Sequence, residues 1–163
     1  MKPQTSYQAI FIAPCVALGI RTGQDRLIGI DLLPADTPAL APQNPMAQQV
    51  CTQLAAYFAD PSFVFDLPLE LGGTPFRRRV WQALREIAPG QTASYGELAQ
   101  RLASAPRAVG QACGANPLPI VIPCHRVVAK NGLGGFMSHG TGDPLDIKRW
   151  LLRHEQADHK RPA

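Results

Sequence analysis

A cysteine beside a histidine, directly after an apolar run that ends in proline, is the feature of this sequence best suited to chemistry. Cys124 and His125 follow residues 117–123, whose apolar composition predicts a strand. A cysteine acts as a nucleophile only as its thiolate, and a neighbouring histidine or positive field lowers the pKa of a thiol. Arg126 adds a positive charge here. The spacing indicates a candidate nucleophile, while an inert buried cysteine is the alternative.

Three helices are predicted before this cysteine. Thr74 and Pro75 provide a cap and a first turn for a helix with apolar residues at helical spacing: Phe76, Val80, Trp81, Leu84 and Ile87. Ser94 and Glu97 form a capping box that opens a second helix ending near residue 103. A turn then leads to a third helix over residues 107–115. The pattern predicts a helix-turn-helix unit.

The amino-terminal residues predict a different architecture. Residues 7–13, 16–22 and 27–33 are rich in β-branched and aromatic side chains and predict a small antiparallel meander. Asn44 and Pro45 then open a helix that runs to about residue 59. Gly72 and Gly73 mark a boundary. We therefore expect an α+β (α/β) fold, with a supporting antiparallel-sheet domain at residues 1–72 and a helical domain with a helix-turn-helix at residues 73–163.

The charges are distributed unevenly between these two parts. Residues 1–75 contain three Lys/Arg and six Asp/Glu, whereas residues 76–130 contain eight Lys/Arg and two Asp/Glu. With 45% hydrophobic and 17% charged residues, the chain has the composition of a globular protein. A basic segment with few acids is typical of a surface that contacts phosphates, and a merely solvated basic face is the alternative.

The cysteines predict neither a metal site nor disulfides. The four of them are scattered, no Cys-x-x-Cys pair occurs, and no histidine precedes position 125, so we expect no metal and no cofactor. A thiol that must stay reduced favours the cytoplasm. The apolar residues 9–20 are too short to span a membrane, and Pro14 before Cys15 does not suit a signal cleavage site.

Four motifs in order carry a resemblance to a known family. Ser-Tyr-Gly-Glu-Leu-Ala occupies 94–99, Arg-Ala-Val-Gly 107–110, Asn-Pro 116–117 and Pro-Cys-His-Arg-Val 123–127. From residue 74 to about 155 the chain closely resembles the O6-alkylguanine-DNA alkyltransferases. The resemblance implies direct transfer of an alkyl group from O6 of guanine in double-stranded DNA to the cysteine, once per molecule and without a cofactor. It leaves O4-alkylthymine open as a further substrate, and we expect a monomer.

The resemblance also assigns roles at the reacting centre. Cys124 matches the alkyl acceptor, and His125 matches the residue that withdraws its proton through a water molecule. Glu155, expected near the end of a helix that Asp143 and Pro144 open, matches the carboxylate that orients this histidine. Asn116 matches the asparagine that braces the turn carrying the active-site strand.

On the DNA side, Arg107 matches the arginine that fills the space of a flipped nucleotide. Tyr95 matches the tyrosine that crowds the adjacent phosphate and donates to the flipped base. A phosphate contact or surface salt bridge for Arg107, and a core aromatic for Tyr95, are the alternatives. The third helix would enter the minor groove, and its small side chains suit either this approach or tight helix packing. The other predicted DNA-binding residues are Ser94, Ala108, Gly110, Gly114 and Arg126.

The resemblance also implies a pocket for the alkyl group beside the cysteine. Its expected lining is Pro119, Val127, Phe136, Met137 and Ser138. Phe136 stands where the family usually has tyrosine, and the loop after it is longer than usual.

Two other functions fit parts of the pattern. A Cys/His hydrolase would use the same dyad with an oxyanion hole, and a helix-turn-helix regulator would bind undamaged DNA without needing Cys124. An alkyltransferase-like protein that recognises lesions without repairing them would lack the reactive cysteine, which this chain has.

Overall fold

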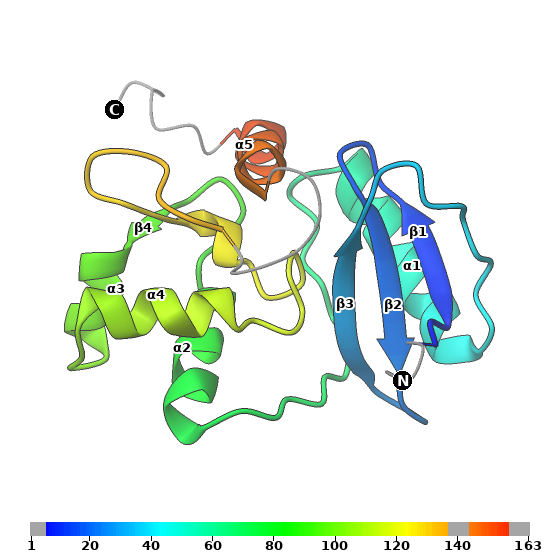
Figure 1. The fold of residues 1–163 in the computed structure, drawn as a ribbon, viewed down its shortest axis with the longest axis horizontal. Helices are drawn as coiled ribbons and strands as arrows, with labels where there is room; N and C mark the ends of the chain where they lie inside the picture. Colours follow the sequence, from blue (N-terminus) through cyan, green and yellow to red (C-terminus); the bar gives the residue numbers. More distant parts are fainter. Residues whose placement is uncertain (1–5, 137–143, 157–163) are drawn as a thin grey trace.

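The amino-terminal part is a small sheet covered by one helix. In the computed structural model, which describes residues 6–136 and 144–156, β1 (Ala9–Ile12), β2 (Ala17–Thr22) and β3 (Leu27–Leu33) form an antiparallel sheet in the order β1-β2-β3. Helix α1 (Pro45–Ala59) lies against it (Figure 1). The Asn44 side chain caps α1 by accepting a hydrogen bond from the Ala47 amide at 2.7 Å. The predicted meander and helix cap are confirmed.

The second part consists of short helices and two very short strands. In chain order these are α2 (Pro75–Arg85), β4 (Ala93–Ser94), α3 (Tyr95–Arg101), α4 (Pro106–Gly114), the 3-10 turn η1 (Cys124–Arg126), β5 (Val127–Val128) and α5 (Pro144–Glu155). Figure 1 shows α2, α3 and α4 at the end of the molecule opposite the sheet. The predicted α+β fold class is confirmed. Among the described residues, no helix has the length and apolarity needed to cross a membrane.

A hydrogen bond and a strand pairing hold together the segments that surround the cysteine. The Trp81 indole N–H on α2 donates to the Ala112 carbonyl on α4 at 2.9 Å, which sets the distance between these helices. β4 and β5 pair in parallel, with Ala93 opposite Val127. Because α3 starts directly after β4, and β5 directly follows η1, this pairing holds the start of α3 beside the Cys124 segment.

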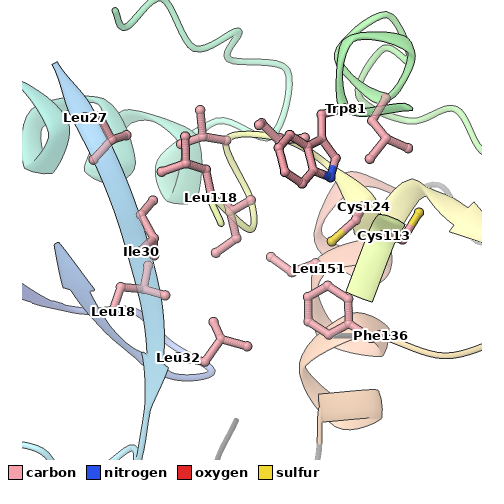
Figure 2. Close-up of a cluster of buried hydrophobic side chains, with 14 of the residues drawn as sticks. Leu18, Leu27, Ile30, Leu32, Trp81, Cys113, Leu118, Cys124, Phe136 and Leu151 are labelled. Atoms are coloured by element: carbon pink, nitrogen blue, oxygen red, sulfur yellow. The ribbon is translucent and has the colours of Figure 1, made fainter. Parts of the chain in front are cut away.

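Buried side chains from both parts belong to one hydrophobic cluster. Leu18 and Ile30 from the sheet, Trp81 from α2 and Leu151 from α5 are all members (Figure 2). The Ile30 amide also donates to the Pro117 carbonyl across the two parts at 2.9 Å. The two parts thus share one core. The expected domain boundary between residues 72 and 73 stays a prediction.

The apolar run before the cysteine is a buried turn, and the prediction of a strand is wrong. The Ile122 amide donates to the Leu118 carbonyl at 2.8 Å, which reverses the chain within five residues. Ile120 at the bend has a φ of 78°, a left-handed conformation rarely adopted by β-branched residues. Prolines at 117, 119 and 123 lack an amide donor and therefore oppose a regular ladder.

The capping box of α3 gives a test of this local architecture. The Ser94 hydroxyl accepts from the Glu97 amide at 3.0 Å, and the Glu97 carboxylate accepts from the Ser94 amide at 2.7 Å. We expect Ser94→Ala to lower the free energy of unfolding by about 1 kcal/mol, measured by urea denaturation. Ser104→Ala, at an exposed position, should change it by less than about 0.5 kcal/mol. Equal losses would contradict the role of the cap.

Candidate active site

Asn116 holds the turn that presents the cysteine. Its side-chain amide donates to the Ile122 carbonyl at 2.8 Å, and its side-chain oxygen accepts from the Leu118 amide at 2.8 Å. Asn116 also hydrogen-bonds the Cys124 side chain. One buried side chain thus bonds to both ends of the turn and contacts the thiol, an arrangement that suits the bracing role implied by the resemblance.

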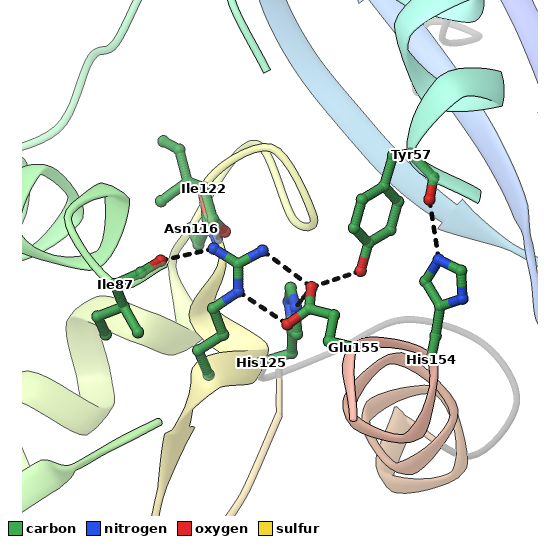
Figure 3. Close-up of polar contacts among 8 residues, drawn as sticks. Tyr57, Ile87, Asn116, Ile122, His125, His154 and Glu155 are labelled. Atoms are coloured by element: carbon green, nitrogen blue, oxygen red, sulfur yellow. Dashed lines mark hydrogen bonds and ion pairs between the residues drawn. The ribbon is translucent and has the colours of Figure 1, made fainter. Parts of the chain in front are cut away.

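Behind the cysteine lies a buried cluster centred on the Glu155 carboxylate (Figure 3). His125 Nε2 lies 2.8 Å from Glu155 Oε2. Arg126 donates from Nε to Oε1 and from Nη2 to Oε2, both at 2.9 Å, and from Nη1 to the Ile87 carbonyl at 2.6 Å. The Tyr57 hydroxyl donates to Oε2 at 2.5 Å. The carboxylate therefore joins η1, α1 and α5.

Burial and the neighbouring charges set the protonation state of His125. Burial lowers the pKa of His125, so its ring is neutral at neutral pH. Burial opposes the ionisation of Glu155, but His125 and Arg126 hold its pKa far below the ordinary value. Since Oε2 is an acceptor, Nε2 carries the proton and Nδ1 is left as the acceptor of the ring. Nδ1 is buried and has no hydrogen-bond partner within the described part of the chain.

The resting thiol is protonated. Burial raises the pKa of Cys124 to about 11, although Asn116 and the charge of Lys148 act in the opposite direction. Lys148 is itself fully buried, and its ammonium donates to the carbonyls of Val127 and Gly135, both at 2.6 Å. Burial lowers the pKa of Lys148 to about 8. A buried cation thus lies near the sulfur and favours its anionic form.

Cys124 lines a cavity of about 460 Å³ that opens beside α4. The lining residues are Tyr95, Pro106, Arg107, Gly110, Cys113, Gly114, Cys124, Gly135 and Phe136. Figure 2 shows Cys113 and Cys124 close to Phe136. A side chain at Gly110 would meet Tyr95 only at an ordinary 3.9 Å, so packing within the protein does not require glycine there.

The structure brings together six of the predicted residues around this cavity: Tyr95, Arg107, Gly110, Gly114, Cys124 and Phe136. Arg107 is exposed, and the Tyr95 hydroxyl donates to the Gly135 carbonyl at 3.3 Å. Ser94 and Ala108 are half-buried and do not line the cavity. Met137 and Ser138 lie outside the described residues.

Three predicted positions need correction. Arg126 is only 6% exposed and its guanidinium is occupied by Glu155 and Ile87, so it does not face DNA as predicted. Pro119 and Val127 are buried in the fold and do not line the cavity. Pro119 instead bridges to Ile122 within the turn, and Val127 pairs with Ala93 of β4 and accepts a hydrogen bond from Lys148.

Sequence reasoning missed Lys148 and Cys113. Lys148 lies on the same face of its helix as Leu151, Leu152 and Glu155, at spacings of three, four and seven residues, and this pattern would have indicated a buried lysine. Cys113 occurs among the small residues of α4, and nothing in the sequence distinguishes it from core. Burial raises its pKa to about 12.

Two further features bear on ligands. Within residues 6–136 and 144–156, no group of three or more His, Cys, Asp or Glu side chains is arranged to hold a metal ion. Seven basic residues of the segment 76–130 are exposed: Arg77, Arg78, Arg79, Arg85, Arg101, Arg107 and Lys130. Arg126 is the basic residue of this segment that the fold buries.

Comparison with known proteins defines the family. A family model described as the DNA-binding domain of 6-O-methylguanine DNA methyltransferase matches residues 75–157. The chain is 36% identical over 157 residues to a methylated-DNA–protein-cysteine methyltransferase of Methanosarcina acetivorans, covering 91% of this chain and 97% of the relative. It is 52% identical over 107 residues to the Salmonella typhimurium protein of the same name, covering 63% of this chain. That match spans 60% of the Salmonella relative's length.

Solved structures agree with this assignment. Mycobacterium tuberculosis O6-methylguanine methyltransferase superimposes with a TM-score of 0.77 at 35% identity, covering 94% of this chain and 93% of that one. Mycobacterium tuberculosis OGT in complex with DNA gives a TM-score of 0.75 at 35% identity, covering 91% and 92% of the two chains. The chain belongs to the 6-O-methylguanine DNA methyltransferase family.

The buried lysine gives a test of the site's electrostatics. Replacing Lys148 by Met removes the cation near Cys124, so we expect the thiol pKa to rise beyond about 11. Iodoacetamide modification of Cys124 at neutral pH, followed by peptide mass spectrometry, should become roughly tenfold slower. Lys130→Met, at an exposed position, serves as the control and should leave the rate unchanged. Faster modification in a folded Lys148→Met protein would contradict this electrostatic role.

Proposed function

We propose that the protein repairs DNA by transferring an alkyl group from O6 of guanine to Cys124, once per molecule. The proposal rests chiefly on the position of Cys124, which lines a cavity beside α4 and is followed by the buried His125–Glu155 pair. Family membership supplies the substrate class, because the relatives are named methylated-DNA–protein-cysteine methyltransferases.

The reaction forms a bond between the Cys124 sulfur and the alkyl carbon and breaks the bond from that carbon to O6. The thiol first loses its proton to His125 Nδ1 through a water molecule, and Glu155 stabilises the imidazolium that forms. The electron pair of the broken bond stays on guanine, which takes up a proton. Burial raises the pKa of Tyr95 to about 12, so its hydroxyl stays protonated and can donate to the base. The products are guanine and a thioether, and no cofactor takes part.

The alkyl carbon lies inside the base stack, so the nucleotide must rotate out of the duplex into the cavity. This costs a few kcal/mol, less for a poorly paired lesion base. Arg107 is exposed at the cavity and can fill the vacated space. The small side chains of α4, including Ala108, Gly110 and Gly114, allow close approach to the minor groove. The exposed basic residues around α2 and α3 would contact phosphates.

We propose that double-stranded DNA carrying the lesion is the partner and that residues 73–163 perform both flipping and transfer. Residues 1–72 would act as a support. We place the protein in the cytoplasm, because its cysteines within the described chain are free thiols and Cys124 must remain reduced to react.

The proposed transfer predicts a specific change in mass. Incubation with duplex DNA carrying O6-methylguanine should add one methyl group per molecule, mapped to Cys124 by peptide mass spectrometry. Cys124→Ser should gain no mass while still binding the duplex. Cys113→Ser removes the other thiol of the cavity and should keep the transfer, because Cys113 is the less readily ionised of the two. Lesion binding by the unaltered protein without a mass gain would exclude repair.

The flipping role of Arg107 predicts a difference between substrates. Arg107→Ala should slow methyl transfer from duplex DNA by roughly tenfold or more, corresponding to a loss of at least about 1.4 kcal/mol. It should leave the reaction with free O6-methylguanine base unchanged, because no base needs to be flipped there. Arg85→Ala, another exposed arginine, controls for the loss of charge. Equal slowing on both substrates would rule out the flipping role.

A further inference from the structure

A tyrosine from the amino-terminal part reaches the centre of the buried cluster. Tyr57 lies on α1, 98 residues before Glu155, and its hydroxyl donates to Glu155 Oε2 at 2.5 Å. His125 Nε2 contacts this same oxygen at 2.8 Å. Figure 3 shows the Tyr57 hydroxyl and the His125 ring both directed at the Glu155 carboxylate. Tyr57 and His125 therefore share one acceptor.

The tyrosine is held firmly in this position. Its side chain is fully buried, and its ring packs edge-on against Phe58 and His154, with centroid distances of 5.1 Å in both pairs. His154 Nε2 also lies 2.8 Å from the Tyr57 carbonyl. Side chain and backbone of Tyr57 are thus both tied to α5, the helix that carries Glu155.

We propose that Tyr57 is a positioning residue for the transfer reaction, which sets the strength of the Glu155–His125 hydrogen bond by donating to the shared oxygen. This inference rests on the proposed function. It assigns part of the reacting machinery to residues 1–72, which sequence reasoning treated as a support alone.

The physical basis is competition for one carboxylate oxygen. A hydroxyl donating to Oε2 offsets part of its negative charge, so less of that charge acts on the His125 ring. Burial and the neighbouring Glu155 raise the pKa of Tyr57 well above the ordinary value, so the hydroxyl keeps its proton. Other charged or titratable groups that act on Tyr57 or His125 are Arg126 from η1, Lys148 and His154 from α5, and Cys15 from the loop before β2.

Tyr57→Phe removes the hydroxyl and keeps the ring that packs against Phe58 and His154. With one donor fewer on Oε2, the carboxylate holds the His125 Nε2 proton more strongly and stabilises the imidazolium. We therefore expect the Nε2–H proton resonance of His125 to move downfield in NMR spectra. Because transfer needs neutral His125, the acid limb of its pH–rate profile should move upward by roughly one pH unit.

Tyr7→Phe is the matched control. Tyr7 also lies in the amino-terminal part and donates to a carboxylate, Asp31, at 2.8 Å, away from the buried cluster. It should change neither the His125 resonance nor the profile. An unchanged resonance in folded Tyr57→Phe would overturn the proposal, as would a shifted resonance with an unchanged pH profile. Failure of the unaltered protein to transfer methyl would instead refute the proposed function, while the resonance would still report the hydrogen bond.

Discussion

The buried Glu155 carboxylate is the interaction on which the rest of the structure depends. An ionised carboxylate away from water is stable only when several donors surround it. Here Arg126 binds both oxygens, and Tyr57 and His125 share Oε2. The donors come from α1 and η1, while the carboxylate comes from α5. The requirement to satisfy one buried charge therefore fixes the relative positions of segments distant in sequence.

Burial also accounts for a nucleophile that is inactive at rest. Burial keeps the Cys124 thiol protonated, with a pKa of about 11. The Asn116 side chain and the Lys148 cation favour its anion. The next residue, His125, is neutral, and its Nδ1 has no hydrogen-bond partner in the described part of the chain. A thiol that ionises only when a base and a positioned substrate are both present is protected from small electrophiles. Such protection would matter for the proposed transfer, in which each molecule reacts once.

How much of this could be read from the sequence varies with the kind of interaction. The caps at Asn44, Thr74 and Ser94 are local, and the side chain of each accepts a hydrogen bond from an amide three residues on. The sequence predicts these caps because each depends only on residues in the first turn of its own helix. The amphipathic face of α2 and the meander were predictable for the same reason.

The long-range contacts were not predictable in this way. From the sequence, Arg126 is expected to be a surface arginine beside Cys124. Its burial depends on Glu155, which lies 29 residues later in the chain. The partner of the Tyr57 hydroxyl lies 98 residues away, and the two partners of Lys148 lie 21 and 13 residues away. The run before Cys124 was predicted as a strand from its apolar composition. That composition does not distinguish a buried strand from a buried turn, and Asn116 satisfies the turn's backbone instead.

Helix α4 meets two requirements of the proposed base flipping. It presents Arg107 at the exposed side of the cavity and Gly110 and Cys113 at its wall, so its position sets both the entry and the width of the cavity. The Trp81 indole holds the last turn of α4 through the Ala112 carbonyl. We expect a helix held in this way to keep its place beside Cys124 when the proposed duplex binds. In the proposed reaction, the energy of DNA binding would then deform the duplex and not the site.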